Sequence, residues 1–163
     1  MRFLLSAALA LCLLPALPTR ASDLPAEITG VWATAESEFN GDRLLGGEVL
    51  YVAPSGMIAL VGAPLPVRRG ADGRVYAPII GIAGTASYDA ARHQLSITLR
   101  DGQRSMQGSG AYRPDDQLLE LSAGPDGQIH RLVRRQAVLP ESMQKMLSDA
   151  ARANAAQPAD KQN

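Results

Sequence analysis

Few residues in this chain have the types and spacing that catalysis or metal binding requires. Ser105 and Ser109 lie near glycines, but neither has the Gly-x-Ser-x-Gly spacing of an exposed nucleophile, so we interpret both as ordinary strand serines. His93 lies in a predicted hairpin turn. His130 lies in the last predicted strand, and we interpret it as a half-buried structural residue that could contact a ligand. Because Cys12 is the only cysteine, two separated histidines make a poor zinc site.

Carboxylates give no stronger signal for a catalytic or metal site. Asp115 and Asp116 form a predicted solvated turn, without the shaped loop of oxygen ligands that calcium requires. Nothing in the spacing of the glutamates on predicted strands orders them into an acid–base pair. The sequence therefore predicts no catalytic residue, no metal site and no cofactor. A small hydrolase or isomerase is an alternative, and it would need two titratable groups facing one cleft. The four glutamates on predicted strands are Glu36, Glu38, Glu48 and Glu120.

Residues 1–21 have the layout of a secretory signal peptide. A basic start precedes an apolar run over 3–17, and small residues follow around the expected cleavage site after Ala21, with Ser22 as the alternative. A lipoprotein signal is disfavoured because Leu11, rather than a small residue, precedes Cys12. We therefore expect a periplasmic or secreted protein with no integral membrane segment after signal removal.

The bulk composition limits the classes of partner. Removal of residues 1–21 from the 163-residue chain leaves 142 residues, which is one domain of ordinary size. Two of the 16 basic residues lie in the signal, so 14 basic residues face 16 acidic ones and the net charge is −2. This balance excludes a strongly basic nucleic-acid binder. Because the only cysteine leaves with the signal, the remaining chain contains no disulfide and no thiol nucleophile.

Turn signals at short, regular intervals predict an all-β fold. Segments rich in Gly, Pro, Asn and Asp, such as 40–42 and 124–127, separate short runs of apolar residues. Residues 95–99 alternate apolar and polar side chains, which indicates one buried face. We predict eight short antiparallel strands that close into an up-and-down barrel, because closure removes exposed edges. The predicted strands are residues 28–37, 44–53, 57–62, 82–88, 94–100, 105–112, 117–122 and 128–134.

Two segments depart from the strand pattern. Residues 63–81 hold three prolines and form a long irregular loop, which is the strongest functional candidate. After the barrel at 22–136, residues 137–156 are predicted to form an amphipathic helix that starts near Pro140 and Glu141. The polar segment 157–163 is predicted to be a disordered tail.

The first predicted strand resembles the start of a small bacterial lipocalin-like, or calycin-type, β-barrel. Gly30 and Trp32 form the Gly-x-Trp of that family, and the resemblance covers roughly residues 28–135. It implies that Trp32 plugs one end of the barrel and that an arginine of the last strand stacks over it. The candidates for this arginine are Arg131, Arg134 and Arg135.

The expected function is non-catalytic binding of a small hydrophobic molecule in or at the mouth of the barrel. Candidate cavity residues are Tyr51, Met57 and Leu60. The alternative is a protein-interaction module, such as a protease inhibitor or envelope accessory protein, with residues 23–27 as an extended arm. In the binding hypothesis, the loop 63–81 acts as a lid. Its candidate contact residues are Arg68, Arg69, Arg74 and Tyr76.

Overall fold

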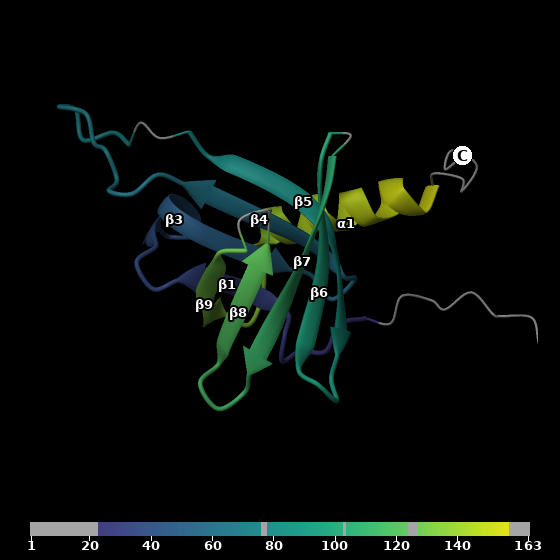
Figure 1. Ribbon diagram of the computed structural model, residues 1–163. Helices are drawn as coiled ribbons and strands as arrows, with labels where there is room; N and C mark the ends of the chain where they lie inside the picture. The colour runs from purple at the N-terminus through teal and green to yellow at the C-terminus, as the bar shows by residue number, and fades with distance from the viewer. Residues whose placement is uncertain (1–22, 76–77, 103, 124–126, 157–163) are drawn as a thin grey trace, which may run out of the picture.

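The computed structural model describes residues 23–156 except 76–77, 103 and 124–126, and within them it shows one antiparallel sheet and one helix (Figure 1). The predicted signal at 1–21 and the predicted tail at 157–163 lie outside the described residues. The strands are β1 (Gly30–Thr34), β2 (Glu38–Asn40), β3 (Arg43–Val52), β4 (Met57–Ala63), β5 (Ile80–Asp89), β6 (Gln94–Asp101), β7 (Arg104–Arg113), β8 (Leu118–Ala123) and β9 (Ile129–Gln136), and the helix is α1 (Glu141–Ala156).

Strand β1 closes the sheet into a barrel, because it pairs with β9 on one side and with β3 on the other. The remaining strands each pair with their sequence neighbours, so eight strands form an antiparallel up-and-down barrel with a C-terminal helix. The predicted fold class is confirmed. The first strand is shorter than predicted: it ends at Thr34, and the three-residue β2 forms a separate hairpin with β3.

The barrel interior is filled by apolar side chains. Strands with period-two alternation point every second residue inward, and Leu95, Ile97 and Leu99 of β6 are all nearly fully buried there. A barrel of eight strands has room for side chains or for one small ligand. Here the side chains occupy the centre. The fully buried members of this inner cluster include Ile28, Trp32, Leu50, Ile58, Leu119, Leu121 and Leu132.

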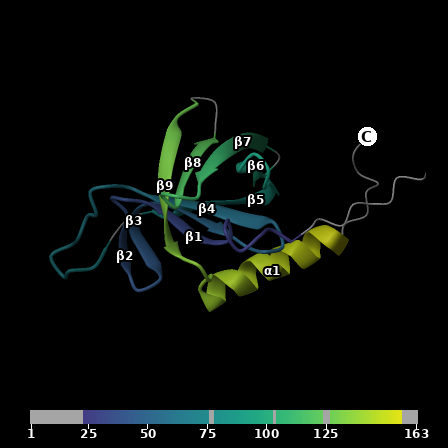
Figure 2. The same cartoon turned by 90° about the horizontal axis from the view of Figure 1, so that it is seen from below.

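Helix α1 lies against the outside of the barrel and creates a second core (Figure 2). It begins at Glu141, directly after Pro140, and residues 137–140 connect it to β9. Its Leu147 is fully buried. Because β1, β3 and β4 are covered by side chains on one face and by α1 on the other, their sequences are apolar at nearly every position. The outer core includes Val31, Ala33, Val49, Tyr51, Met57 and Ala59.

Trp32 and Arg134 close one end of the barrel. Trp32 is fully buried, and its indole Nε1 donates to the Ile28 carbonyl at 2.8 Å. The Arg134 guanidinium carbon lies 5.6 Å from the centre of the Trp32 ring, and Tyr112 meets the same ring edge-on. Of the three candidate arginines, Arg134 alternates inward with the buried Leu132, so it is the one that lies over the tryptophan.

The other two candidate arginines point outward and make different contacts. Arg135 stacks on Phe39 of β2, with its guanidinium carbon 3.9 Å from the ring centre. Arg131 lies 3.3 Å from a carboxylate oxygen of Glu120. A stacked cation on an aromatic ring contributes about 0.5–2 kcal/mol, so Arg135 helps to hold the β2–β3 hairpin against β9.

The segment before β1 is fixed to this closed end. The Leu24 side chain belongs to the inner core, and its amide donates to the Pro54 carbonyl at 2.7 Å. Arg134 Nη2 donates to the carbonyls of Ala26 and Thr29, at 2.6 and 2.8 Å. Residues 23–29 therefore form part of the barrel plug.

Gly30 is needed where this segment enters β1. Its φ of +117° lies in a region that other residues rarely adopt. A Cβ at this position would collide with the Gln136 carbonyl, next to the register shift between Val31 and Trp32. The glycine of the Gly-x-Trp pair thus permits the close approach of β1 to β9.

We expect Leu147→Ala to lower the free energy of unfolding by about 2–5 kcal/mol, because it opens a cavity in the outer core. Met146→Ala is the matched control, since that side chain is 48% exposed and its loss should cost less than about 0.5 kcal/mol. Urea unfolding of both variants measures the difference. Equal effects would show that α1 is not docked as described.

We expect the Tyr88 phenol to ionise at a higher pH than an ordinary tyrosine. Burial, and then a hydrogen bond to Glu27, raise the pKa of Tyr88 from 10.0 to about 12. Since the folded pKa lies above the ordinary value, the free energy of unfolding should fall as the pH rises through this window. Titration of phenolate absorbance checks this, and the difference between the wild type and Tyr88→Phe separates Tyr88 from Tyr51, whose pKa burial also raises. Glu27→Gln should lower the Tyr88 pKa without restoring the ordinary value. Ionisation of Tyr88 near 10 in the wild type would contradict the docking of Glu27.

Candidate functional site

The end of the barrel opposite the plug is open, and it holds the polar residues that face the interior. At this end β1 stops at Thr34, so β9 before Leu132 has no partner on β1, and β3 before Val49 is bonded instead by Ser37 and by β2. The connection from β4 to β5 leaves the barrel here and extends away from it (Figure 1). We call this region the open end.

Glu48 of β3 and His130 of β9 meet at the open end. His130 Nδ1 lies 2.5 Å from Glu48 Oε2, although the two residues are 82 positions apart in the chain. Glu48 alternates with the buried Leu50, and His130 with the buried Leu132, so both side chains lie on the inner faces of their strands. The His130 side chain is 23% exposed and the Glu48 side chain 40% exposed.

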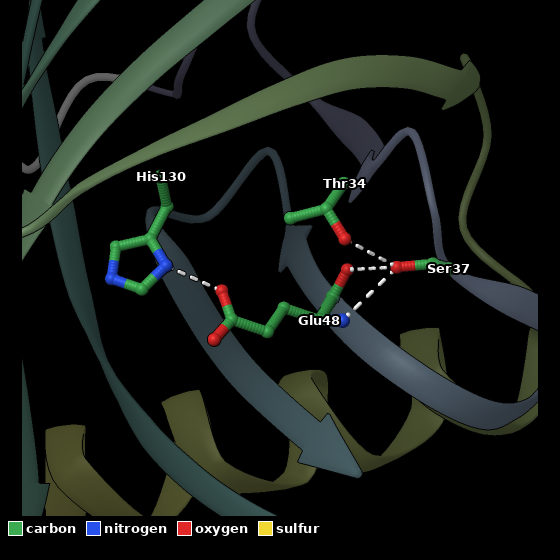
Figure 3. A network of polar contacts seen from close by, with 4 residues as sticks. All are labelled: Thr34, Ser37, Glu48 and His130. Atoms are coloured by element: carbon green, nitrogen blue, oxygen red, sulfur yellow. Dashed lines mark hydrogen bonds and ion pairs between the residues drawn. The ribbon is translucent and has the colours of Figure 1, made fainter. Parts of the chain in front are cut away.

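Ser37 fixes the backbone of Glu48 (Figure 3). Its hydroxyl donates to the Glu48 carbonyl at 2.9 Å and accepts from the Glu48 amide at 3.0 Å. Because the Ser37 hydroxyl proton is already donated to the Glu48 carbonyl, the Thr34 hydroxyl is the donor in its 2.8 Å hydrogen bond to Ser37. Neighbouring Gly47 has a φ of +96°, and a Cβ there would collide with Ser37. A side chain thus replaces the strand partner that β1 no longer supplies, and it sets the position of Glu48.

A polar cavity of about 420 Å³ lies on one side of the Glu48–His130 pair. Two carboxylates and several other residues with polar side chains line it. The polar side chains in this wall are Thr34, Glu36, Glu48, Gln128, His130 and Arg131.

An apolar groove of about 300 Å³ lies on the other side of the pair. Glu48, Ala63 and His130 line both hollows, so the pair stands at the boundary between a polar and an apolar environment. Few polar groups beside a mostly apolar wall are typical of small-molecule sites. The apolar side chains of the groove include Leu60, Pro64, Pro78, Ile80 and Ile82.

Exposed apolar side chains surround these two hollows. Ile80 is 67% exposed and Ile129 63% exposed, and Leu65 and Ile79 are also exposed. Clustered exposed apolar side chains are unusual on a soluble domain and mark binding surfaces. The open end therefore has the composition of a binding region rather than that of an ordinary solvated rim.

Of the three predicted cavity residues, only Leu60 lines the groove. Tyr51 and Met57 lie on the opposite face of the sheet, in the outer core beneath α1, and this corrects their predicted position. Burial there, followed by the charge of Asp42, raises the pKa of the Tyr51 phenol. The error has a simple cause: β3 and β4 are apolar on both faces, so alternation could not show which residues point inward.

The two ends of the loop that was predicted to be a lid line the hollows of the open end, whereas its arginines do not. Leu65 lines the polar cavity, and Pro64 and Pro78 line the groove. Arg69 lies 3.8 Å from Glu38, and Arg74 lies 3.5 Å from Asp72, so these arginines have acidic neighbours within reach. Arg68 lines neither hollow. Tyr76 lies outside the described residues.

Sequence reasoning missed the Glu48–His130 pair. Glu48 was one of four glutamates without an assigned partner, and His130 was interpreted as structural. Their spacing from buried neighbours, two residues from Leu50 and Leu132, was the available signal that both face inward. The contact forms because β3 and β9 lie on either side of β1 in the closed barrel.

The other candidate chemical groups lie elsewhere. Ser105 and Ser109 of β7 are exposed and line neither hollow. His93 lies at the plugged end, where Nδ1 is 3.0 Å from the Tyr88 hydroxyl. The described residues contain no group of three or more His, Cys, Asp or Glu side chains arranged to hold a metal ion.

Comparison of the chain with protein families, curated proteins and solved structures found no match. Among the described residues, α1 is too short and too polar to cross a membrane as a helix.

We expect Ser37→Ala to lower the free energy of unfolding by about 1 kcal/mol or more, because it leaves the Glu48 amide and carbonyl without their partner. Ser87→Ala, on an exposed outward position of β5, is the matched control and should change it by less than about 0.5 kcal/mol. Urea unfolding compares the two variants. The same small effect in both would mean that Ser37 does not hold Glu48 in place.

Proposed function

We propose that this protein is an exported, non-catalytic binding module of the lipocalin-like kind, which holds a small apolar molecule at the open end of its barrel. The observation that carries the proposal is the apolar groove beside the Glu48–His130 pair. The interior next to the Trp32 plug is filled by side chains, so the ligand binds at the mouth rather than in the centre. The signal-like residues 1–21 support export.

Exposure of the rim supports the same function. Ile80 lines the groove and is 67% exposed without a ligand. Removing apolar surface from water contributes about 25 cal/mol per Å² to the free energy of binding. A ligand that covers Ile80 therefore gains affinity from a side chain that is otherwise in water. Ile80 is both a groove residue and an exposed one, so the groove extends to exposed apolar surface at the start of β5.

The alternative, a protein-interaction module with an extended N-terminal arm, has less support. Residues 23–27 would have to be free to enter a partner, yet Leu24 is 8% exposed and packs in the inner core. Releasing this segment would also break the hydrogen bonds from Arg134 to Ala26 and Thr29. No other feature of the described residues favours this function over small-molecule binding.

We expect the uncharged fluorescent probe N-phenyl-1-naphthylamine to bind the protein and to lose affinity by about ten-fold or more in Ile80→Glu. Ile80 lines the groove and is exposed, so a charge there blocks apolar binding without disturbing the core. Val133→Glu is the matched control, because Val133 is also exposed but lies on β9 outside both hollows. Fluorescence titration measures both affinities.

Two results would contradict the proposed site. If the probe does not bind the wild type, the open end is not an apolar binding site. If Ile80→Glu and Val133→Glu bind it equally well, the probe occupies another surface, such as the crevice between Gly30 and α1.

A further inference from the structure

The hydrogen bond between His130 and Glu48 determines which polar atoms remain for a ligand. A carboxylate oxygen only accepts, so at 2.5 Å the proton lies on His130 Nδ1. In the singly protonated imidazole, Nε2 is then an acceptor. Figure 3 shows this second nitrogen on the side of the ring that points away from Glu48. The ring therefore carries a hydrogen-bond acceptor on its side away from Glu48.

Glu48 offers a second acceptor. Its Oε2 binds His130, whereas Oε1 has no hydrogen bond from any residue that the structure describes. The side chain is 40% exposed, so Oε1 can be reached from the open end. Ser37 holds the backbone of Glu48, and the bond to His130 holds its carboxylate. A ligand would meet this oxygen in a preset position.

Carboxylates outnumber cations around the polar cavity, with Glu36 and Glu48 against Arg131. Glu36 adds a second carboxylate to the wall. Arg131 also reaches the wall, but its Nε lies 3.3 Å from Glu120, whose other oxygen binds Arg113 at 2.9 Å. The arginine is therefore engaged on the outer face of the barrel. The acceptors at the boundary of the two hollows thus suit a positively charged hydrogen-bond donor.

We propose that the ligand is a small cationic amphiphile, with a protonated amine head at Glu48, which His130 positions, and an apolar body in the groove. This inference rests on the proposed function and adds the chemical class of the ligand. An ammonium group has three donors and no acceptor. It can donate to Glu48 Oε1 while its apolar body contacts Leu60 and Ile80 in the groove. His130 holds that carboxylate in place through its bond to Oε2. A carboxylate head would instead meet the like charge of Glu48.

The test compares three ligands that share one chain and differ in the head: n-octylamine, n-octanoate and n-octanol. Isothermal titration calorimetry on the wild-type protein at neutral pH needs no variant. We expect n-octylamine to bind at least about ten-fold more tightly than n-octanoate, which corresponds to about 1.4 kcal/mol, with n-octanol between them.

Glu48→Gln then tests the origin of this preference. It should weaken n-octylamine by about ten-fold, strengthen n-octanoate and leave n-octanol within about two-fold. Glu141→Gln at the start of α1 removes the same charge from a residue that lines neither hollow, and it should leave all three affinities unchanged. His130→Gln provides a second variant in case Glu48→Gln does not fold, and it should also weaken n-octylamine more than n-octanol. Thermal unfolding of each variant checks that it is folded.

Failure of this inference and failure of the proposed function give different results. If n-octanoate binds as tightly as n-octylamine, or if Glu48→Gln and Glu141→Gln affect n-octylamine equally, the cationic head is wrong. The groove is still the binding site if Ile80→Glu weakens all three ligands. If none of the three ligands and no N-phenyl-1-naphthylamine binds, both the function and the ligand class are wrong.

Discussion

The packing of large apolar side chains inside an eight-stranded barrel is the constraint on which the other features of this protein depend. Trp32 fills the centre near one end, and residues such as Leu99 and Leu121 occupy the remaining space with little or no exposure to water. A barrel of this size cannot hold both these side chains and an internal ligand. Any binding site formed by the barrel must therefore lie at an end, and one end is already closed by Arg134 and residues 23–29.

The two ends of the barrel differ because β1 is shorter than its neighbours. At the plugged end, Gly30 lets β1 approach β9 closely, and the preceding segment is hydrogen-bonded to Arg134. At the open end, β1 stops at Thr34 and the Ser37 hydroxyl takes over its hydrogen bonds to β3. The polar cavity lies where β1 stops and is lined by Thr34 and Glu36, and Glu48 lines both this cavity and the apolar groove. The same strand end therefore creates both the opening and the support of the acidic side chain.

Strands with a wet face could be predicted well, and strands covered on both faces could not be oriented. β6 alternates strictly, and its inward residues agree with the pattern. β3 and β4 are apolar on both faces because α1 covers their outer side, so alternation could not show that Tyr51 and Met57 face the helix. β2 was missed because a three-residue strand next to a turn has no periodicity to detect. The alternation of Arg134 with Leu132 was a signal that Arg134 is the arginine over Trp32, although the resemblance alone does not distinguish it from Arg131 and Arg135.

By itself, the sequence determined the fold class, the approximate strands and the helix that starts after Pro140, because period-two patterns, glycine turns and a proline are local signals. The position of Trp32 at one end of the barrel was implied only by the lipocalin-like resemblance. Only the tertiary structure decided that Glu48 meets His130 across 82 positions. That contact requires β3 and β9 to lie on either side of β1. This arrangement exists only once the sheet has closed into a barrel. Local residue patterns carry no information about such a distance, so the candidate site emerged only when the sheet was closed.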